Sequence, residues 1–284
     1  MASLIGLLTD FGTRASYVSS MKGAILSICD ACTIVDLSHD ISPHDIMEAA
    51  LFLENCCEYF PRGFIFLAVV DPGVGTSRRM LCLRTRSRAQ VFIAPDNGLL
   101  DPVMQAQGVD LLVSLENHRY WRVARSDTFH GRDIMGPVAA HVAAGIDIAA
   151  LGPAIDPSTT VKLAMPPQSR VAEDGTITGA VLYIDQFGNV ITNVRKEQLV
   201  KAGVRQDDML QIRFHANGKG TRPGIQAPLK RTYAEVGNGE YLCLINSENR
   251  FEIARNIGSA ATMLGVQESG SLLEIKDVTQ HEAR

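Results

Sequence analysis

A continuous apolar run in the first half of the chain ends directly in a carboxylate. Residues 63–70 read GFIFLAVV, and Asp71 follows. A run of this length without polar alternation is typical of a strand that is buried on both faces of a parallel sheet. Open α/β folds bind their ligands where such strands end, so we expect Asp71 to lie at a ligand-binding edge of the sheet.

Segments with strand and helix periodicity alternate over residues 1 to about 150. The pattern predicts further strands at residues 4–8, 33–37, 80–84, 91–94 and 111–115. It predicts helices at residues 17–29, at 42–60, from about residue 101 and at 133–144. This alternation indicates a mostly parallel sheet that is covered by helices on both faces.

The helix at residues 42–60 has a recognisable start in its sequence. We expect Ser42 to be the N-cap, Pro43 to occupy the first turn, and Asp45 to lie at the positive end of the helix dipole. Pro61 ends the helix, since proline cannot continue it.

The pattern changes after the first half. Prolines accumulate and periodicity is lost around residues 152–169, and we interpret residues 153–170 as a linker. Short β-rich runs follow at residues 179–185, 190–194, 209–214, 241–246 and 272–278. We therefore expect an α/β N-terminal domain with a mostly parallel central sheet at residues 1–152 and a smaller C-terminal β-barrel domain at 171–284.

The charge and composition of the chain argue against nucleic acid or an anionic membrane as its binding partner. The chain has 284 residues, 46% of them hydrophobic, and a net charge of −4, which gives no general attraction to nucleic acid or to an anionic membrane. Arg84, Arg86 and Arg88 alternate, and we interpret them as the solvent face of a strand. No aromatic residues are interleaved with them for base stacking.

The six cysteines favour a reducing compartment. Most lie in apolar segments, and a chain of this length does not need disulfides to fold. Cys29 and Cys32 form a single C-x-x-C without a second pair, so we expect no zinc site there. No apolar run approaches the length that spans a membrane, and no signal peptide is visible, so we expect a cytoplasmic protein.

Three short segments concentrate the chemistry of the first half. They read LTDFG at residues 8–12, VDPGVGTSR at 70–78 and TFHGRD at 128–133. Each combines a carboxylate, a glycine and a hydroxyl or cation. The second is not a phosphate-binding loop, because no Gly-Lys-Ser/Thr follows its glycines. Arg132 and Asp133 have a simpler interpretation, as a pair or cap before a helix.

Histidines and aspartates also allow a different class of enzyme. His39, His44 and His141, with Asp36, Asp40, Asp45 and Asp96, could in principle hold the metal of a phosphohydrolase. Their spacing is scattered, so we expect no metal site.

Seven segments, in this order and with these separations, resemble the S-adenosyl-L-methionine (SAM) hydroxide adenosyltransferases. These adenosine-forming SAM hydrolases are related to the SAM-dependent chlorinase and fluorinase. The matching segments are residues 9–13, 35–45, 70–78, 94–98, 128–133, 184–189 and 245–247. The resemblance therefore covers almost the whole chain.

The resemblance implies an α/β N-terminal domain, a C-terminal β-barrel and a homotrimer. SAM would be held between the N-terminal domain of one subunit and the C-terminal domain of the next. The implied catalytic set is Asp71, Arg78 and His130 around the attacking water. The implied substrate-binding residues are Asp10, Gly131, Asp185, Phe187, Asn189, Asn246 and Ser247.

Individual roles follow from the same resemblance. Asp10 is expected on the ribose hydroxyls, and Asp185 and Asn189 near the methionine part. Phe187 would stack on or wall the purine, while Asn246 and Ser247 would contact the amino-acid or adenine end. Gly131 stands where the fluorinase has its halide-binding serine, and the chlorinase is similar to this chain in having glycine there.

The implied reaction is attack of water on C5′ of the ribose, which expels methionine as a neutral thioether. It needs no metal, cofactor or general acid, but a free hydroxide is scarce because the pKa of bulk water is about 15.7. Arg78 would supply positive potential, and Asp71 or His130 would accept the proton. We favour His130, because a neighbouring arginine weakens Asp71 as a base.

One position departs from the family pattern. Members carry an acidic residue shortly after the TDFG segment, placed for the methionine ammonium, whereas this chain has Ala15. Asp185 or Ser16 would have to compensate. Two alternatives to the hydrolase remain, a SAM-dependent halogenase and a sensor that binds SAM or adenosine without turnover.

Overall fold

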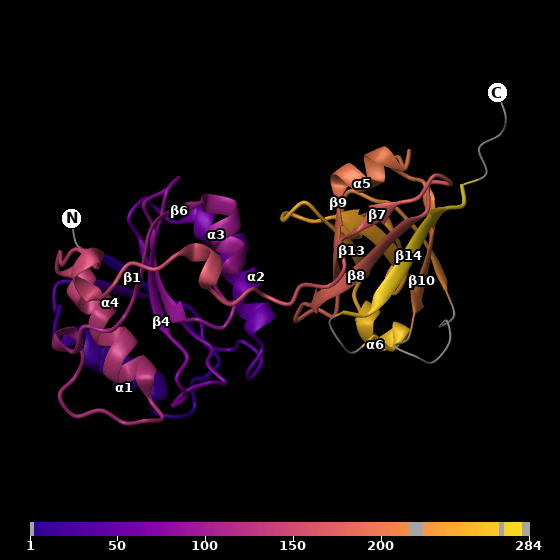
Figure 1. The fold of residues 1–284 in the computed structure, drawn as a ribbon. Coiled ribbons are helices and arrows are strands. Elements are labelled where there is room, and N and C mark those ends of the chain that lie inside the picture. Colours follow the sequence, from indigo (N-terminus) through magenta and orange to yellow (C-terminus); the bar gives the residue numbers. More distant parts are fainter. Residues whose placement is uncertain (1–2, 216–223, 267–269, 280–284) are drawn as a thin grey trace. The chain divides into compact units, whose positions relative to one another are not determined.

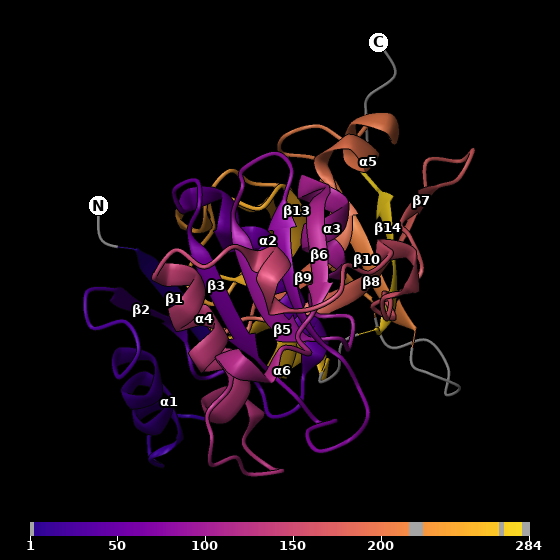
Figure 2. The same cartoon turned by 60° about the vertical axis from the view of Figure 1, so that its left-hand side comes forward.

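The chain forms two compact units. The structure is a computed structural model that describes residues 3–215, 224–266 and 270–279 (Figures 1 and 2). The division falls between Ala164 and Met165. Of the predicted linker at 153–170, residues 153–164 belong to the first unit and residues 165–170 to the second. Ala154 pairs with Val113, and the carbonyl of Thr159 accepts a hydrogen bond of 2.6 Å from Arg79.

The first unit is built on a six-stranded sheet. Its strand order is β2-β1-β3-β5-β4-β6. The pairs β1–β2, β1–β3 and β3–β5 are parallel, and β4 runs antiparallel to β5 and β6. The prediction of a mostly parallel sheet is confirmed. The strands are β1 (Leu4–Thr9), β2 (Thr33–Ser38), β3 (Ile65–Val69), β4 (Met80–Thr85), β5 (Val91–Pro95) and β6 (Val109–Ser114).

Successive side chains of the central strand supply two separate cores. Leu67 and Val69 pack in the cluster that holds α1 (Tyr17–Leu26) and α4 (Gly136–Ala143). Phe66 and Ala68 point to the opposite face, where α2 (Ile46–Cys56) and α3 (Asp101–Gln107) pack. Figure 1 shows these two pairs of helices on opposite faces of the sheet. Burial on both faces explains why the strand is apolar without alternation.

The start of α2 differs from the prediction. The N-cap is Asp45, whose carboxylate accepts a hydrogen bond of 2.9 Å from the backbone N–H of Glu48. Ser42 is not the cap, because His44 adopts a left-handed backbone with φ of 68° and interrupts any helix that begins earlier. The α-helix also ends at Cys56 and continues only as a 3₁₀ turn, Cys57–Tyr59.

The predicted arginine face of a strand is only partly present. Strand β4 includes Arg84 but ends at Thr85, so Arg86 and Arg88 lie in the turn that leads to β5. There Arg88 donates a hydrogen bond of 2.9 Å to the carbonyl of Phe60. The alternation therefore reflects a turn that is tied to the end of the α2 segment.

The second unit is a nearly closed antiparallel barrel. The strand order is β11-β10-β14-β8-β9-β13-β12, with β7 paired to β8. A bridge between Leu229, just after β11, and Cys243 of β12 brings the two edges together. The strands are β7 (Arg170–Val171), β8 (Ile177–Ile184), β9 (Val190–Arg195), β10 (Met209–His215), β11 (Ile225–Pro228), β12 (Tyr241–Ile245), β13 (Arg250–Arg255) and β14 (Leu272–Asp277), with helices α5 (Lys196–Lys201) and α6 (Ala260–Leu264).

Candidate active site

A cavity of about 290 Å³ lies where the parallel strands of the first unit end. Asp10 follows β1 and Asp71 follows β3, so parallel pairing of these strands brings the two carboxylates to the same edge. The segment before α4 closes the cavity from the other side. The lining residues are Asp10, Phe11, Tyr17, Pro43, His44, Val69, Asp71, Val74, Thr128, Phe129, His130 and Gly131.

Asp71, Arg78 and His130 form one hydrogen-bonded set. The Arg78 guanidinium donates from Nε to Asp71 Oδ1 at 2.7 Å and from Nη2 to Oδ2. The same Nη2 lies 3.1 Å from Nδ1 of His130. The side chains of Asp71 and Arg78 are 5% and 10% exposed, so the pair is largely shielded from solvent. Shielding strengthens the field that this pair exerts on a reacting group.

The contact with Arg78 fixes the state of His130. A guanidinium can only donate, so Nδ1 must accept, and Nε2 carries the proton of the neutral ring. Burial lowers the pKa of His130 below its usual range, and the charge of Arg78 lowers it further. His130 is therefore neutral at pH 7, and its Nδ1 is already in use.

A second ion pair fixes the loop that carries Phe129 and His130. Arg132 donates to both carboxylate oxygens of Asp133, at 2.7 Å each, and the backbone N–H of Ser126 donates to the same carboxylate at 2.8 Å. Burial by itself would raise the pKa of Asp133, but these hydrogen bonds outweigh it and hold the pKa below its usual range. Asp133 is thus an ionised, fully buried anchor of the loop.

This loop approaches the segment of Asp71 and Arg78 closely at one glycine. Gly75 has φ of 83°, and a Cβ there would lie 2.9 Å from the carbonyl oxygen of Asp127. Only glycine fits both the backbone conformation and the space. Gly75 therefore permits close packing of the two loops that carry the candidate catalytic set.

Asp10 is held at the cavity by its backbone surroundings. Its Oδ2 accepts a hydrogen bond of 2.9 Å from the backbone N–H of His44, and its side chain is 9% exposed. The imidazole of His44 is 3.9 Å away and mostly exposed. Oδ1 has no protein partner among the hydrogen bonds of the described residues, which leaves it available to a bound hydroxyl group.

Gly131 begins a helical segment that is pressed onto the sheet. Residues Gly131–Met135 wind as a π-helix that leads into α4, with the N–H of Gly136 bonded to the Gly131 carbonyl. The helix thus starts before the predicted residue 133. A Cβ on Gly131 would lie 3.2 Å from Val69 Cγ1, so glycine here permits close packing of helix on strand.

Three aromatic rings at the cavity were not among the predicted site residues. Phe11, Tyr17 and Phe129 contact one another edge to face, with ring centroids 5.5–5.8 Å apart. The Arg132 guanidinium lies 4.8 Å from the centre of the Phe129 ring. The signal in the sequence was the position of Phe11 and Phe129 inside two of the polar segments.

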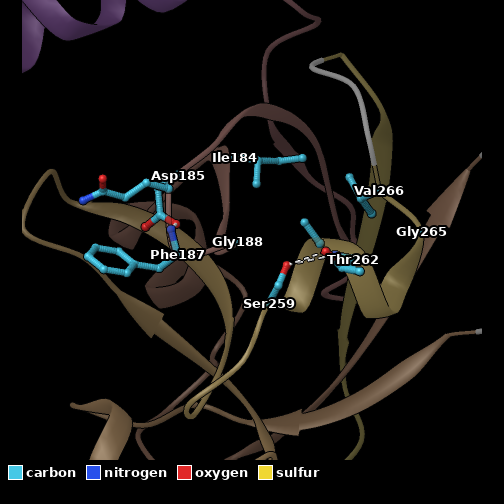
Figure 3. Close-up of a pocket in the computed structure, with 10 residues that line it drawn as sticks. Ile184, Asp185, Phe187, Gly188, Ser259, Thr262, Gly265 and Val266 are labelled. Atoms are coloured by element: carbon cyan, nitrogen blue, oxygen red, sulfur yellow. Dashed lines mark hydrogen bonds between the residues drawn. The ribbon is translucent and has the colours of Figure 1, made fainter. Parts of the chain in front are cut away.

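The remaining predicted residues lie on turns of the second unit. Asp185 follows β8, and its carboxylate accepts hydrogen bonds of 2.9 Å from the backbone N–H groups of Phe187 and Asn189 and from the Asn189 amide. Asn189 is 5% exposed, and Phe187 is 68% exposed. Asp185 and Phe187 border a cavity of about 480 Å³ opposite Ser259 and Thr262 (Figure 3).

Asn246 and Ser247 form the turn between β12 and β13. Asn246 Oδ1 accepts from the backbone N–H groups of Glu248 and Arg250, both at 3.0 Å, so it shapes the turn. Ser247 is exposed. Behind this turn lies Glu252, which accepts a hydrogen bond of 2.7 Å from Tyr233. Burial and the nearby charge of Asp185 raise the pKa of Glu252.

Ala15 is exposed, as is Ser16, the residue before α1, whose side chain makes no capping hydrogen bond. Neither lines the cavity of the first unit, although Tyr17 does. Neither residue therefore offers the methionine ammonium a partner at this cavity.

Three of the four aspartates considered for a metal are engaged elsewhere, and the fourth, Asp40, is exposed. Asp96 pairs with Arg79 at 2.6 Å, Asp36 pairs with Lys22 at 2.7 Å, and Asp45 caps α2. Within the described ranges, no group of three or more His, Cys, Asp or Glu side chains has an arrangement that could hold a metal ion. Over the same ranges, no helix has the length and apolar character needed to cross a membrane.

Comparison with known proteins connects both units to one family. Residues 5–152 match the SAM hydroxide adenosyltransferase N-terminal domain, and residues 179–272 match the C-terminal domain of the same family. An (R)-S-adenosyl-L-methionine hydrolase of Salinispora tropica is 35% identical, with 92% of this chain and 94% of the relative covered. The corresponding hydrolase of Methanocaldococcus jannaschii is 34% identical, with 93% and 92% covered.

A halogenating relative and a solved structure also match. A fluorinase of Actinoplanes sp. is 31% identical over 91% of this chain and 92% of its own length. The crystal structure of a conserved protein from Thermotoga maritima superimposes with a TM-score of 0.87 at 35% identity, covering 95% of this chain and 99% of the other. The chain belongs to the SAM hydroxide adenosyltransferase family.

Proposed function

We propose that this protein hydrolyses S-adenosyl-L-methionine to adenosine and L-methionine. The observation that carries the proposal is the hydrogen-bonded set of Asp71, Arg78 and His130 at a cavity of the first unit. Relatives at 33–35% identity that are named (R)-S-adenosyl-L-methionine hydrolase support the choice of substrate. The reaction is an in-line attack by water on C5′ of the ribose, with methionine as the leaving group.

In this mechanism, the ion pair positions and polarises the water. Asp71 and Arg78 are shielded from solvent, so the guanidinium holds the Asp71 carboxylate in place to accept a hydrogen bond from the attacking water. The sulfonium departs as a neutral thioether, so the leaving group requires no proton. Holding water in line with the C–S bond then accounts for much of the rate.

The geometry shifts our choice of proton acceptor from His130 to Asp71. Nδ1 of His130 already accepts from Arg78, and a proton there would lie beside a fixed positive charge. Each oxygen of Asp71 keeps a second lone pair beyond its bond to Arg78. The water becomes strongly acidic as its oxygen bonds to carbon, so a paired carboxylate is basic enough to receive the proton. His130 then holds Arg78 in register.

Substrate binding would involve residues of both units. Asp10 offers Oδ1 to the ribose hydroxyls, in keeping with its single backbone partner. Asp185 and Asn189 are the candidates for the methionine part, and their mutual hydrogen bonds fix the turn that would present them. We propose that the protein is a homotrimer in which the barrel of one subunit completes the site of the next.

We further propose that turnover needs no metal or cofactor, because the leaving group is already activated by its positive charge. All six cysteines are free thiols, which is what a reducing compartment maintains. On that ground we propose a cytoplasmic location.

The test is incubation of chelator-treated protein with SAM in ¹⁸O-labelled water, with and without chloride, followed by chromatography and mass spectrometry. The proposal expects adenosine that carries the label in its 5′-hydroxyl, together with methionine. A 5′-chloro product would identify a halogenase instead, and unchanged SAM with measurable binding would identify a sensor. Activity that requires an added metal would contradict the metal-free mechanism.

A further inference from the structure

The side chains of Thr9, His39 and Asp36 form a hydrogen-bonded network next to Asp10, and this network takes no part in the mechanism described above. Thr9, the last residue of β1, places its hydroxyl 2.8 Å from Nδ1 of His39, and Nε2 of His39 lies 3.0 Å from Oδ1 of Asp36. A hydroxyl, an imidazole and a carboxylate are thus connected in the order of a hydrolytic triad.

Burial excludes a nucleophilic role for this triad. Thr9 is fully buried and His39 is 5% exposed, so no substrate reaches the hydroxyl. The Thr9 oxygen is also occupied, because it accepts a hydrogen bond of 3.3 Å from the backbone N–H of Phe11. The network must therefore hold neighbouring residues in place rather than react with a ligand.

The direction of the hydrogen bonds is set by the carboxylate. Asp36 accepts, so Nε2 of His39 is a donor, and in the neutral ring Nδ1 is then the acceptor. Thr9 then donates its hydroxyl proton to Nδ1 and keeps its lone pairs for the N–H of Phe11. Each hydrogen bond of the network then has one donor and one acceptor, and the Thr9 hydroxyl both donates and accepts. Lys22 holds the outer end through a 2.7 Å ion pair with Asp36.

Two hydrogen bonds of this network hold the backbone immediately after Asp10. The Thr9 hydroxyl binds the N–H of Phe11, and the His39 carbonyl accepts a hydrogen bond of 2.8 Å from the N–H of Gly12. Gly12 has φ of 63°, so the chain turns sharply there. The segment after His39 also supplies the His44 N–H that binds the Asp10 carboxylate. Residues 39–44 thereby contact the Thr9 side chain before Asp10, the Asp10 carboxylate itself and the Gly12 backbone after it.

We propose that Thr9 and His39, backed by Asp36, are positioning residues that fix the Asp10 carboxylate for the substrate ribose. This inference rests on the role of Asp10 in the proposed function. Thr9 and His39 touch no substrate, and they act through the backbone of residues 10–12. The three side chains thus have the connectivity of a hydrolytic triad, but they orient Asp10.

The experiment measures the Kd of adenosine by calorimetry and kcat/KM for SAM in matched variants. Thr9→Val removes the hydroxyl at nearly constant shape, and we expect a loss of affinity on the order of tenfold, since two buried polar groups lose their partner. Thr9→Ser keeps the hydroxyl and should stay within about twofold of the native protein. Thr85→Val is the control, because Thr85 is a buried threonine at the opposite end of the sheet.

A double-mutant cycle with Asp10→Asn separates positioning from a general structural role. If Thr9 acts through Asp10, Thr9→Val should add less than about twofold in the Asp10→Asn background. Full additivity, or a Thr9→Val protein that binds as well as Thr85→Val, overturns the inference. If Thr9→Val fails to fold, Asp36→Ala removes the half-exposed end of the same network. We expect it to weaken adenosine binding by about threefold.

Measurements on the native protein distinguish failure of the proposed SAM hydrolysis from failure of the proposed role of Thr9 and His39. Absence of SAM hydrolysis with normal adenosine binding contradicts the proposed function, and the Kd ratios still decide the role of Thr9. A native protein that binds neither SAM nor adenosine contradicts both.

Discussion

Two arginine–carboxylate pairs lie near His130, and they have the same chemistry but different surroundings. Arg78 and Arg132 each direct Nε and Nη2 at the two oxygens of an aspartate. Asp71 lines the cavity, whereas Asp133 is fully buried beneath the loop that it anchors. Arg78 also contacts an imidazole, whereas Asp133 also accepts from a backbone N–H and lies 3.5 Å from the Arg122 guanidinium.

The comparison shows that access to substrate decides whether an arginine–carboxylate pair can take part in the reaction or only stabilises the fold. Each oxygen of Asp71 keeps a lone pair at the edge of a cavity, where a water molecule can use it. The oxygens of Asp133 are engaged by Arg132, by Arg122 and by the backbone N–H of Ser126. Loss of the first pair should therefore affect rate, and loss of the second should affect stability.

The largest expected effect is on the rate of the Asp71→Asn variant. An amide cannot accept the proton and pairs with Arg78 through one oxygen only, so kcat should fall by about 10²–10⁴-fold. The melting temperature should also fall, because the largely buried Arg78 guanidinium loses its charged partner. Adenosine formation in single-turnover and steady-state assays measures the effect. A variant that keeps a third of native kcat would remove Asp71 from the proposed mechanism.

The second effect is the stability of Asp133→Asn. Loss of charge-assisted hydrogen bonds to a buried carboxylate should cost about 2 kcal/mol of unfolding free energy. This corresponds to a fall of about 5 °C in melting temperature. The low pKa of Asp133 means that its contribution is present above about pH 3.8 and is lost as the pH falls further.

The control for Asp133 is Asp110→Asn, which breaks an exposed pair with Arg84. It should change the unfolding free energy by less than about 1 kcal/mol. Equal losses for the two variants would show that burial does not distinguish these pairs.

The third effect is on the pH profile. His130 has a pKa below its ordinary 6.5, so kcat/KM should stay level as the pH falls through 6.5 and decline only below it. In His130→Gln this part of the acid limb should disappear. The unfolded chain takes up the histidine proton first, so stability also declines as the pH falls below 6.5. An acid limb centred at or above pH 6.5 would contradict the assignment.

The smallest effect is expected for Gly131→Ser. Its Cβ would press on Val69 at 3.2 Å, which a small shift of the helix start can absorb. We expect less than about a tenfold loss in kcat/KM and a melting temperature a few degrees lower. Gly23→Ser in α1 is the control, because its Cβ would meet nothing within 4 Å. A 5′-chloro product from Gly131→Ser, but not from the native protein, would show that this position selects the nucleophile.

Much of the fold was predictable from local patterns, and the failures have physical reasons. The start of α2 was misplaced because the left-handed backbone of His44 is set by its place beside Asp10. Strand β13 was missed because Arg250 and Glu252 are buried charged residues, and only the fold supplies Tyr233 as the partner of Glu252. Local propensity does not report partners that are distant in sequence.

The sequence by itself determined the two architectures, because the apolar runs of the first half and the β-rich runs of the second are local properties of the chain. Through the resemblance, it also selected Asp71, Arg78 and His130. Only the tertiary structure decided that Arg78 bridges Asp71 and a histidine 52 positions later, and that Thr9 and His39 lie behind Asp10. Those contacts depend on parallel strands ending at one edge of the sheet, and burial there determines which polar groups reach the cavity.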